Sequence, residues 1–246
     1  MKAAPEAQLR LLDLQELDTA LDRLAHRRRT LPELAEIDRI GGRTAELGDR
    51  ITTAETDVSD LDREQSKAEQ DVEQVRQRAD RDQKRLDSGQ VTSAKDLENL
   101  QSEIVSLQRR QSDLEEVVLE IMERQEAAAA RLAEIRAEQI SAQSELAVLT
   151  ERRDAAEQEI DAEAGMTSTA RTAVAKGIAD DVLALYEKLR VQFGVGAAAL
   201  HRGQCQGCHL ALNTTDLNRI RATPADEVVR CEECRRILVR TPESGL

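Results

Sequence analysis

The sequence predicts a mainly α-helical protein, in which a long antiparallel coiled-coil helical hairpin is followed by a small C-terminal domain. Three observations predict this class. Aromatic residues make up 1% of the 246 residues and charged residues 34%, which is typical of long helices, because a compact domain normally builds its core around aromatic side chains. Apolar residues recur every 3.5 positions over two long stretches. All four cysteines lie between positions 205 and 234.

Charge and hydropathy exclude several classes of function and location. The net charge of −13 argues against a protein that coats nucleic acid through bulk electrostatics. No stretch approaches the roughly 20 apolar residues of a membrane span, and residues 1–10 lack the apolar segment of a signal peptide. We therefore expect a soluble, cytoplasmic protein with no membrane partner.

Residues 1–165 are predicted to form the hairpin, with a kink near 30–33. Leu14, Leu17, Leu21 and Leu24 share one helical register, which is not continued from Leu31 onwards. Thr30 followed by Glu33 resembles a capping box for a new helix. Pro32 lacks a backbone donor and clashes one turn back, so the chain should bend there.

Two heptad runs make up the arms, from Ile40 to Leu86 and from Leu97 to Leu149. A strict 3.5-residue period over six or more heptads imposes a left-handed supercoil. The turn between the arms falls near 87–93, where Gly89 suits a left-handed helix stop. Seam positions of the two arms pair with an index sum near 183, so we predict that the chain folds back on itself. The pairs include Leu86 with Leu97, Ala79 with Ile104, Leu61 with Ile121, and Ile51 with Leu132.

Several seam positions are polar, mostly opposite Val or Leu. We interpret them as fixing the register at some cost in stability, with a ligand site along the seam as the alternative. They are Gln65, Asp82, Gln111, Gln125 and Gln139.

Glycines mark three further features of the helices. Gly41 and Gly42 are expected to permit close approach of the second arm at Ser141 and Ala142, with a second bend as the alternative. The second arm is predicted to end near Gly165, so that residues 166–246 hold short helices and a metal-binding domain. A short amphipathic helix follows, marked by apolar residues from Ile178 to Leu189 and closed by Gly194.

The cysteines form a doubled C-x2-C motif, Cys205 with Cys208 and Cys231 with Cys234, separated by 22 residues. Two such turns present four thiolates in the arrangement of a zinc ribbon, with Zn–S bonds of about 2.3 Å. A dithiol redox pair or an iron–sulfur site is the alternative. Four thiolates fill the coordination sphere, so one structural Zn2+ is predicted, with no open position for a catalytic water.

Four segments carry a resemblance to a known family: KDLENLQSEI at 95–104, DVLALYEKLR at 181–190, GQCQGC at 203–208 and DEVVRCEECRRIL at 226–238. They resemble the bacterial C4-type zinc ribbon and coiled-coil hairpin family, often labelled nucleic-acid-binding zinc ribbon proteins. The resemblance implies an adaptor, because characterised relatives bind a nitrogen-type alternative sigma factor, secretion or flagellar components, and in one lineage a messenger RNA. Arg235 stands where relatives usually have Gly, which implies either a left-handed Arg at a cost of about 1–2 kcal/mol or a turn with relaxed geometry. Asn213 stands where they often have Pro.

Two functions follow from these observations. The first is a non-enzymatic, zinc-binding adaptor that binds protein partners, of unknown identity, through the coiled coil and the ribbon. The alternative is a nucleic-acid-binding ribbon with a regulatory role in gene expression. The chain has no Gly-rich phosphate loop and no Ser/His/Asp set, so neither an enzyme nor a small-molecule substrate is expected. Five arginines are candidates for partner or nucleic-acid contacts if they converge on one ribbon face: Arg219, Arg221, Arg235, Arg236 and Arg240.

Overall fold

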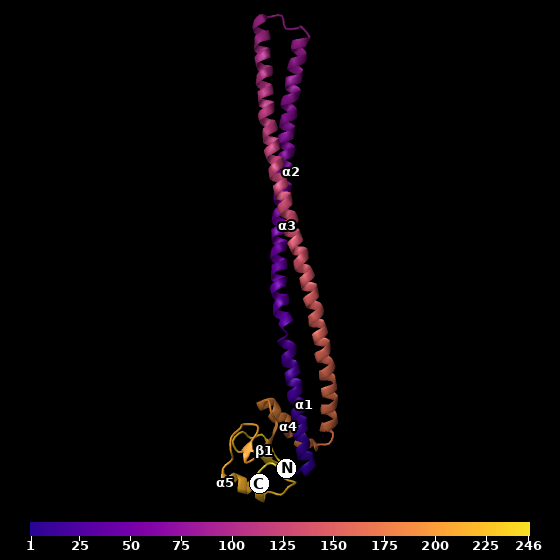
Figure 1. Ribbon diagram of the computed structural model, residues 1–246, viewed down its shortest axis with the longest axis vertical. Coiled ribbons are helices and arrows are strands. Elements are labelled where there is room, and N and C mark those ends of the chain that lie inside the picture. The colour runs from indigo at the N-terminus through magenta and orange to yellow at the C-terminus, as the bar shows by residue number, and fades with distance from the viewer. The chain divides into compact units, whose positions relative to one another are not determined.

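A computed structural model, shown as a ribbon in Figure 1, describes residues 1–246. They divide into two compact units. The hairpin unit comprises residues 35–150, and the ribbon unit comprises residues 1–34 and 151–246. No helix has the length and apolar character to cross a membrane. The helices are α1 (Pro5–Arg29), α2 (Pro32–Asp87), α3 (Ala94–Ala175), α4 (Asp180–Phe193) and α5 (Thr214–Ala222), and the strands are β1 (Ala197–His201), β2 (Gln204–Cys205), β3 (Val229–Arg230) and β4 (Ile237–Arg240).

The hairpin unit confirms the antiparallel arms. Figure 1 shows α2 and α3 side by side, running in opposite directions from a short turn. Alternating 4- and 3-residue spacing places one apolar stripe on each helix, and the stripes bury against each other. Arg39 and Glu145 reach across the arms, as do Arg50 and Glu138. The best-buried seam residues are Ile40, Leu47, Ala54, Leu132, Ile135 and Ala142.

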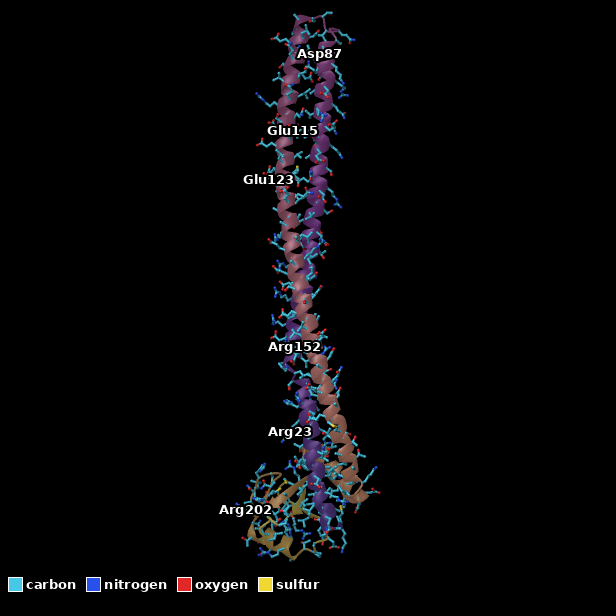
Figure 2. All side chains as sticks on the ribbon, turned by 45° about the vertical axis from the view of Figure 1, so that its right-hand side comes forward. Arg23, Asp87, Glu115, Glu123, Arg152 and Arg202 are labelled. Carbon is cyan, nitrogen blue, oxygen red and sulfur yellow. The ribbon has the colours of Figure 1, made fainter.

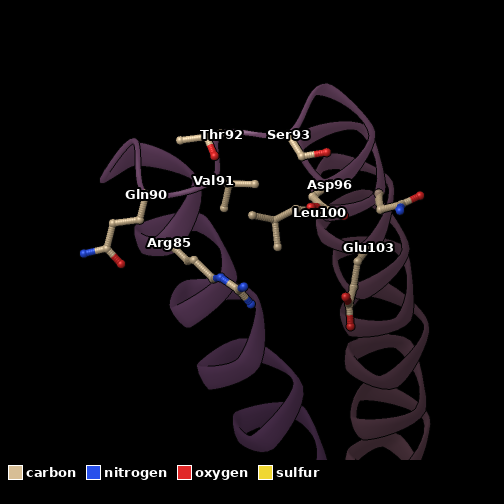
Figure 3. A pocket seen from close by; sticks show the side chains of 9 residues that line it. Arg85, Gln90, Val91, Thr92, Ser93, Asp96, Leu100 and Glu103 are labelled. Atoms are coloured by element: carbon tan, nitrogen blue, oxygen red, sulfur yellow. The ribbon is translucent and has the colours of Figure 1, made fainter.

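The turn occupies residues 88–93, as predicted. Gly89 has a φ of 68°, the left-handed conformation that glycine adopts without steric cost. Figure 3 shows the side chains of Val91 and Leu100 facing each other beneath the turn, with Arg85 and Glu103 on either side. These residues line a cavity of about 340 Å³.

Two glycines of α2 do not have the predicted role. A Cβ added at Gly41 or Gly42 would meet no atom within 4 Å, so the expected close approach of the second arm is wrong. Both residues lie inside the continuous helix α2. Neither space nor backbone conformation in the folded state therefore requires glycine at these positions.

The predicted break near residues 30–33 is present between α1 and α2. Thr30, however, closes α1 instead of capping α2: its hydroxyl donates to the carbonyl of His26 at 2.9 Å. A threonine hydroxyl can bond one turn back as readily as it caps the next helix. Pro32 occupies the first position of α2, where its missing N–H is not needed.

The predicted end of the second arm at Gly165 is wrong, because α3 continues to Ala175. The hydroxyls of Thr167 and Thr169 donate to carbonyls four residues earlier and remain compatible with the helix. Val174 and Ala175 then pack against the core of the ribbon unit, and this burial outweighs the roughly 1 kcal/mol cost of one helical glycine. The predicted boundary at 165/166 consequently falls within α3.

The ribbon unit is built on a four-stranded sheet in the order β2-β1-β4-β3. Strand β1 runs parallel to β4 and antiparallel to β2, and β3 pairs antiparallel with β4. The predicted helix is present as α4, closed by Gly194 in the left-handed conformation. One core joins α1, α4 and the sheet, and it contains Leu11, Leu14, Val182, Tyr186, Leu189, Ala197, Ile237 and Val239.

Candidate metal centre and its surroundings

The sheet brings the two C-x2-C turns together. Cys205 lies at the end of β2, and Cys231 follows β3, so each turn extends from one strand pair. The four sulfur atoms lie within 4.8 Å of one another. The Sγ atoms of Cys205 and Cys234 are 3.9 Å apart, as are those of Cys208 and Cys231.

These distances fit a tetrahedral zinc ion. Bonds of about 2.3 Å give S–S edges of about 3.8 Å, whereas a disulfide requires about 2.05 Å. All four cysteines are free. The cluster therefore fits one structural zinc ion held by Cys205, Cys208, Cys231 and Cys234, with every ligand position filled.

The two turns share one backbone conformation. The amide of His209 donates to the carbonyl of Cys205 at 2.8 Å, and the amide of Arg235 donates to the carbonyl of Cys231 at 2.9 Å. The φ angles are 58° at His209 and 61° at Arg235. Of the two alternatives for Arg235, the structure has the left-handed one. His209 was missed, although it follows its C-x2-C turn at the same position as Arg235.

Burial raises the pKa of the Cys205 and Cys231 thiols, that of Cys231 to about 12. Backbone amides hydrogen-bond to both sulfurs and act in the opposite direction, because they stabilise the thiolate. In the metal-free protein the buried sulfurs therefore favour the protonated form. Zinc requires thiolates, so binding must release protons.

Two of the five candidate arginines hold the ribbon's own backbone. The Arg240 guanidinium donates to five carbonyls between residues 220 and 227, including that of Thr223 at 2.8 Å. Arg236 donates to the carbonyls of Val195 and Gly207 and lies over the Phe193 ring, 5.3 Å from its centroid. Both side chains connect loops to the sheet, which leaves few donors for a ligand.

The other three candidates differ in their neighbours. Arg219 and Arg235 converge on Glu232, at 2.6 and 3.4 Å. Arg221 contacts the amide oxygen of Asn218 and lies exposed on α5. The five arginines thus do not form one free basic face, which was the arrangement expected of a phosphate-binding surface.

A buried polar cluster between α1, α3 and α4 was not predicted. The carboxylate of Asp18, whose side chain is 1% exposed, accepts from the Tyr186 hydroxyl at 2.7 Å and from Arg171 at 2.6 Å. Arg190 lies 3.2 Å from the same carboxylate. The side-chain oxygen of Gln15 accepts a hydrogen bond from the backbone N–H of Gly196 at 2.7 Å. The sequence signal was an acid at position 18 within the leucine stripe of α1.

Comparisons with known proteins agree with this architecture. Residues 14–194 match the model of the CT398-like coiled coil hairpin domain, and residues 204–238 match the C4-type zinc ribbon domain. Two uncharacterized proteins of Mycobacterium tuberculosis, MT2288 and Rv2229c, are each 38% identical over 82 residues, which is 33% of this chain. The match spans 34% of the length of those relatives.

Solved structures extend the likeness to the whole chain. A structure from Mycobacterium smegmatis is 37% identical with a TM-score of 0.86, covering 98% of this chain and 100% of that one. CT398 from Chlamydia trachomatis is 19% identical with a TM-score of 0.70, covering 96% and 98%. At that identity the likeness shows the fold alone. The hairpin, the ribbon and these matches establish that the chain belongs to the CT398-like coiled coil hairpin family and carries a C4-type zinc ribbon domain.

Proposed function

We propose that this protein is a non-enzymatic adaptor that binds protein partners through its coiled-coil hairpin and zinc ribbon. The cysteine site supports this role, because four thiolates leave zinc no position for a catalytic water. Zinc then stabilises a small domain whose own core is limited, which is its usual function in ribbons.

The ribbon arginines already have partners within the protein, and this observation favours a protein over a nucleic acid as the binding partner. Arg236 and Arg240 are committed to backbone carbonyls, and Arg219 and Arg235 share Glu232. Nucleic-acid binding without sequence preference needs a basic groove and aromatic stacking platforms. The chain has one Tyr, which is buried, and one Phe, which is 37% exposed and has the Arg236 guanidinium over one face of its ring.

Two measurements test this proposal. Fluorescence anisotropy with a labelled single-stranded RNA and a labelled DNA duplex should give dissociation constants no tighter than about 10⁻⁴ M, the weak end of non-specific binding. Affinity capture from native lysate should retain protein partners after nuclease treatment, and those partners should bind the purified chain directly. A Cys208→Ser, Cys231→Ser variant shows which partners require the ribbon.

The opposite outcome of the two measurements would reject the proposal. Tight, salt-dependent binding to either oligonucleotide, together with partners that disappear after nuclease treatment, would reject a protein-binding adaptor in favour of a nucleic-acid-binding ribbon. Arg221→Glu is the informative variant in that case, because Arg221 is exposed and contacts no acidic residue.

A further inference from the structure

The hairpin unit carries most of the negative charge. Residues 35–150 contain 16 Lys and Arg and 27 Asp and Glu, a net charge of −11 out of the −13 of the whole chain. A charge of this size attracts basic partners and repels nucleic acid. Acidic side chains indicate a binding surface most clearly where they surround exposed apolar side chains.

Such a place exists along the seam, in a cleft of about 300 Å³ between α2 and α3. Its floor is apolar and is formed by Val72 of α2 with Val118 and Leu119 of α3. The acidic residues Glu69, Glu73 and Glu115 complete its lining. We call these six residues the seam cleft.

Two polar seam residues explain why the arms do not close here. The predicted register places Gln65 opposite Val118, and Gln111 opposite Val72. Neither amide fills the seam, because Gln65 donates to Glu69 at 2.7 Å and Gln111 donates to Glu115 at 2.8 Å. Both valines consequently stay partly exposed.

The ion pairs between the arms also leave this segment open. Arg124 bonds Glu64 on one side of the seam cleft, and Arg78 bonds Glu103 on the other. No ion pair joins the arms between these two. Glu69 and Glu115 therefore present carboxylates that no arginine or lysine of the chain neutralises.

Further exposed apolar side chains lie along α3, although Gln108 and Ser112 separate Val105 from the seam cleft. Val105 and Leu119 are each 61% exposed, and Met122 is 39% exposed. Positions 105, 119 and 122 are separated by 14 and 3 residues, so they lie on one face of a coiled-coil helix. Leu119 and Met122, one turn apart beside the seam, provide an apolar contact for a third helix packed against the hairpin.

Acids dominate the same part of α3. Arg124 is the single basic residue from 113 to 126, and it is already paired with Glu64. Figure 2 labels Glu115 and Glu123 among the charged side chains of this segment. The acidic residues are Asp113, Glu115, Glu116, Glu120, Glu123 and Glu126.

We propose that the seam cleft binds a basic amphipathic helix of a partner protein. The apolar face of that helix covers Val72, Val118 and Leu119, and its flanking Lys or Arg side chains pair with Glu69 and Glu115. Glu73 already pairs with Arg76 of α2. This proposal rests on the protein-binding function proposed above and assigns it a surface. A helix is favoured over an extended peptide because the cleft lies between two helices and offers no unpaired strand edge.

The test measures binding of a designed peptide to the purified full-length chain. The peptide has three heptads with Leu at a and d and Lys at e and g, and a second peptide carries Glu in place of Lys. The first should bind, with affinity that falls as salt rises. Leu119→Ser should weaken it about tenfold, because it removes an exposed anchor of the apolar face. Glu69→Lys with Glu115→Lys should weaken it at least as much and reduce the salt dependence.

Matched controls separate the cleft from the general acidity of the hairpin. Ile140→Ser removes an equally exposed apolar residue of α3 outside the cleft. Asp38→Lys with Glu134→Lys makes the same charge change at exposed, unpaired positions of α2 and α3. Both controls should bind the Lys peptide within about twofold of the wild-type chain, a change of less than about 0.5 kcal/mol. Circular dichroism verifies that every variant keeps its helicity.

Several results would overturn the proposal: equal weakening by cleft and control variants, full binding by the cleft variants, or equal affinity for the Glu peptide. A dimer in sedimentation experiments that Leu119→Ser dissociates would also overturn it, because a second copy would then cover this face. None of these results affects nuclease-resistant capture of partners, so failure of the cleft is distinguishable from failure of the adaptor function.

Discussion

Replacing Asp18 with alanine should destabilise the ribbon unit by about 3–5 kcal/mol, the usual cost of removing one partner from a buried ion pair. The Asp18 carboxylate is 1% exposed and accepts from Tyr186 and Arg171, with Arg190 at 3.2 Å. Without it, the buried Tyr186 hydroxyl loses its acceptor, and each guanidinium keeps only a more exposed carboxylate, Glu187 for Arg171 and Asp22 for Arg190. For a unit of about 130 residues this corresponds to a decrease of roughly 10–20 °C in Tm.

The assay uses a natural probe. Tyr186 is the sole tyrosine, lies in the ribbon unit, and no tryptophan is present, so tyrosine fluorescence follows the unfolding of the ribbon unit alone. Asp22→Ala is the matched control: Asp22 is on the same helix and bonds the same Arg190, but its side chain is 59% exposed. Exposed pairs contribute about 0–1 kcal/mol. Equal losses for the two variants, or a loss below about 1 kcal/mol for Asp18→Ala, would refute the reasoning.

Three further predictions concern glycine, alkaline pH and zinc. Gly41→Ala and Gly42→Ala should each stabilise the hairpin by about 0.5–1 kcal/mol in denaturant unfolding, since neither site restricts a Cβ; Gly196→Ala should destabilise, because its Cβ would lie 2.6 Å from the Tyr186 carbonyl oxygen. Burial and the Asp18 carboxylate raise the pKa of Tyr186. The contribution of its neutral hydroxyl to the free energy of unfolding is therefore complete below the unfolded-state pKa of about 10 and is lost as pH rises above that value. Tyrosinate absorbance should then appear together with unfolding, and a simple titration near pH 10 in folded protein would contradict this. Chelation of zinc, or Cys208→Ser, should unfold the ribbon while far-ultraviolet circular dichroism retains nearly all hairpin helicity; equal loss of both would be the contrary outcome.

The coiled-coil period was sufficient to predict the arms, their turn and their register. Heptad spacing is a local property that tertiary context rarely overrides over six repeats, so Leu47, Ile104 and Leu132 are buried at the seam positions that the period predicts. The metal site was likewise predictable, because the spacing of Cys205, Cys208, Cys231 and Cys234 reports the chelating geometry directly.

Features that depend on distant partners could not be predicted. The end of α3 at Ala175 is set by packing against α1 and α4, which the weak helix formers near Gly165 do not reveal. The burial of Asp18 requires Arg171, more than 150 residues away. Arg236 and Arg240 looked like surface arginines because no local signal distinguishes a carbonyl-bonding guanidinium from a free one.

X-ray absorption spectroscopy at the zinc edge tests the central claim most directly. Protein purified without chelator should contain one zinc per chain, with four sulfur neighbours at about 2.3 Å and no nitrogen or oxygen neighbour. That result would identify a closed, structural site in a binding protein. An oxygen or nitrogen ligand, a disulfide within either C-x2-C turn, or protein without bound metal would contradict the account.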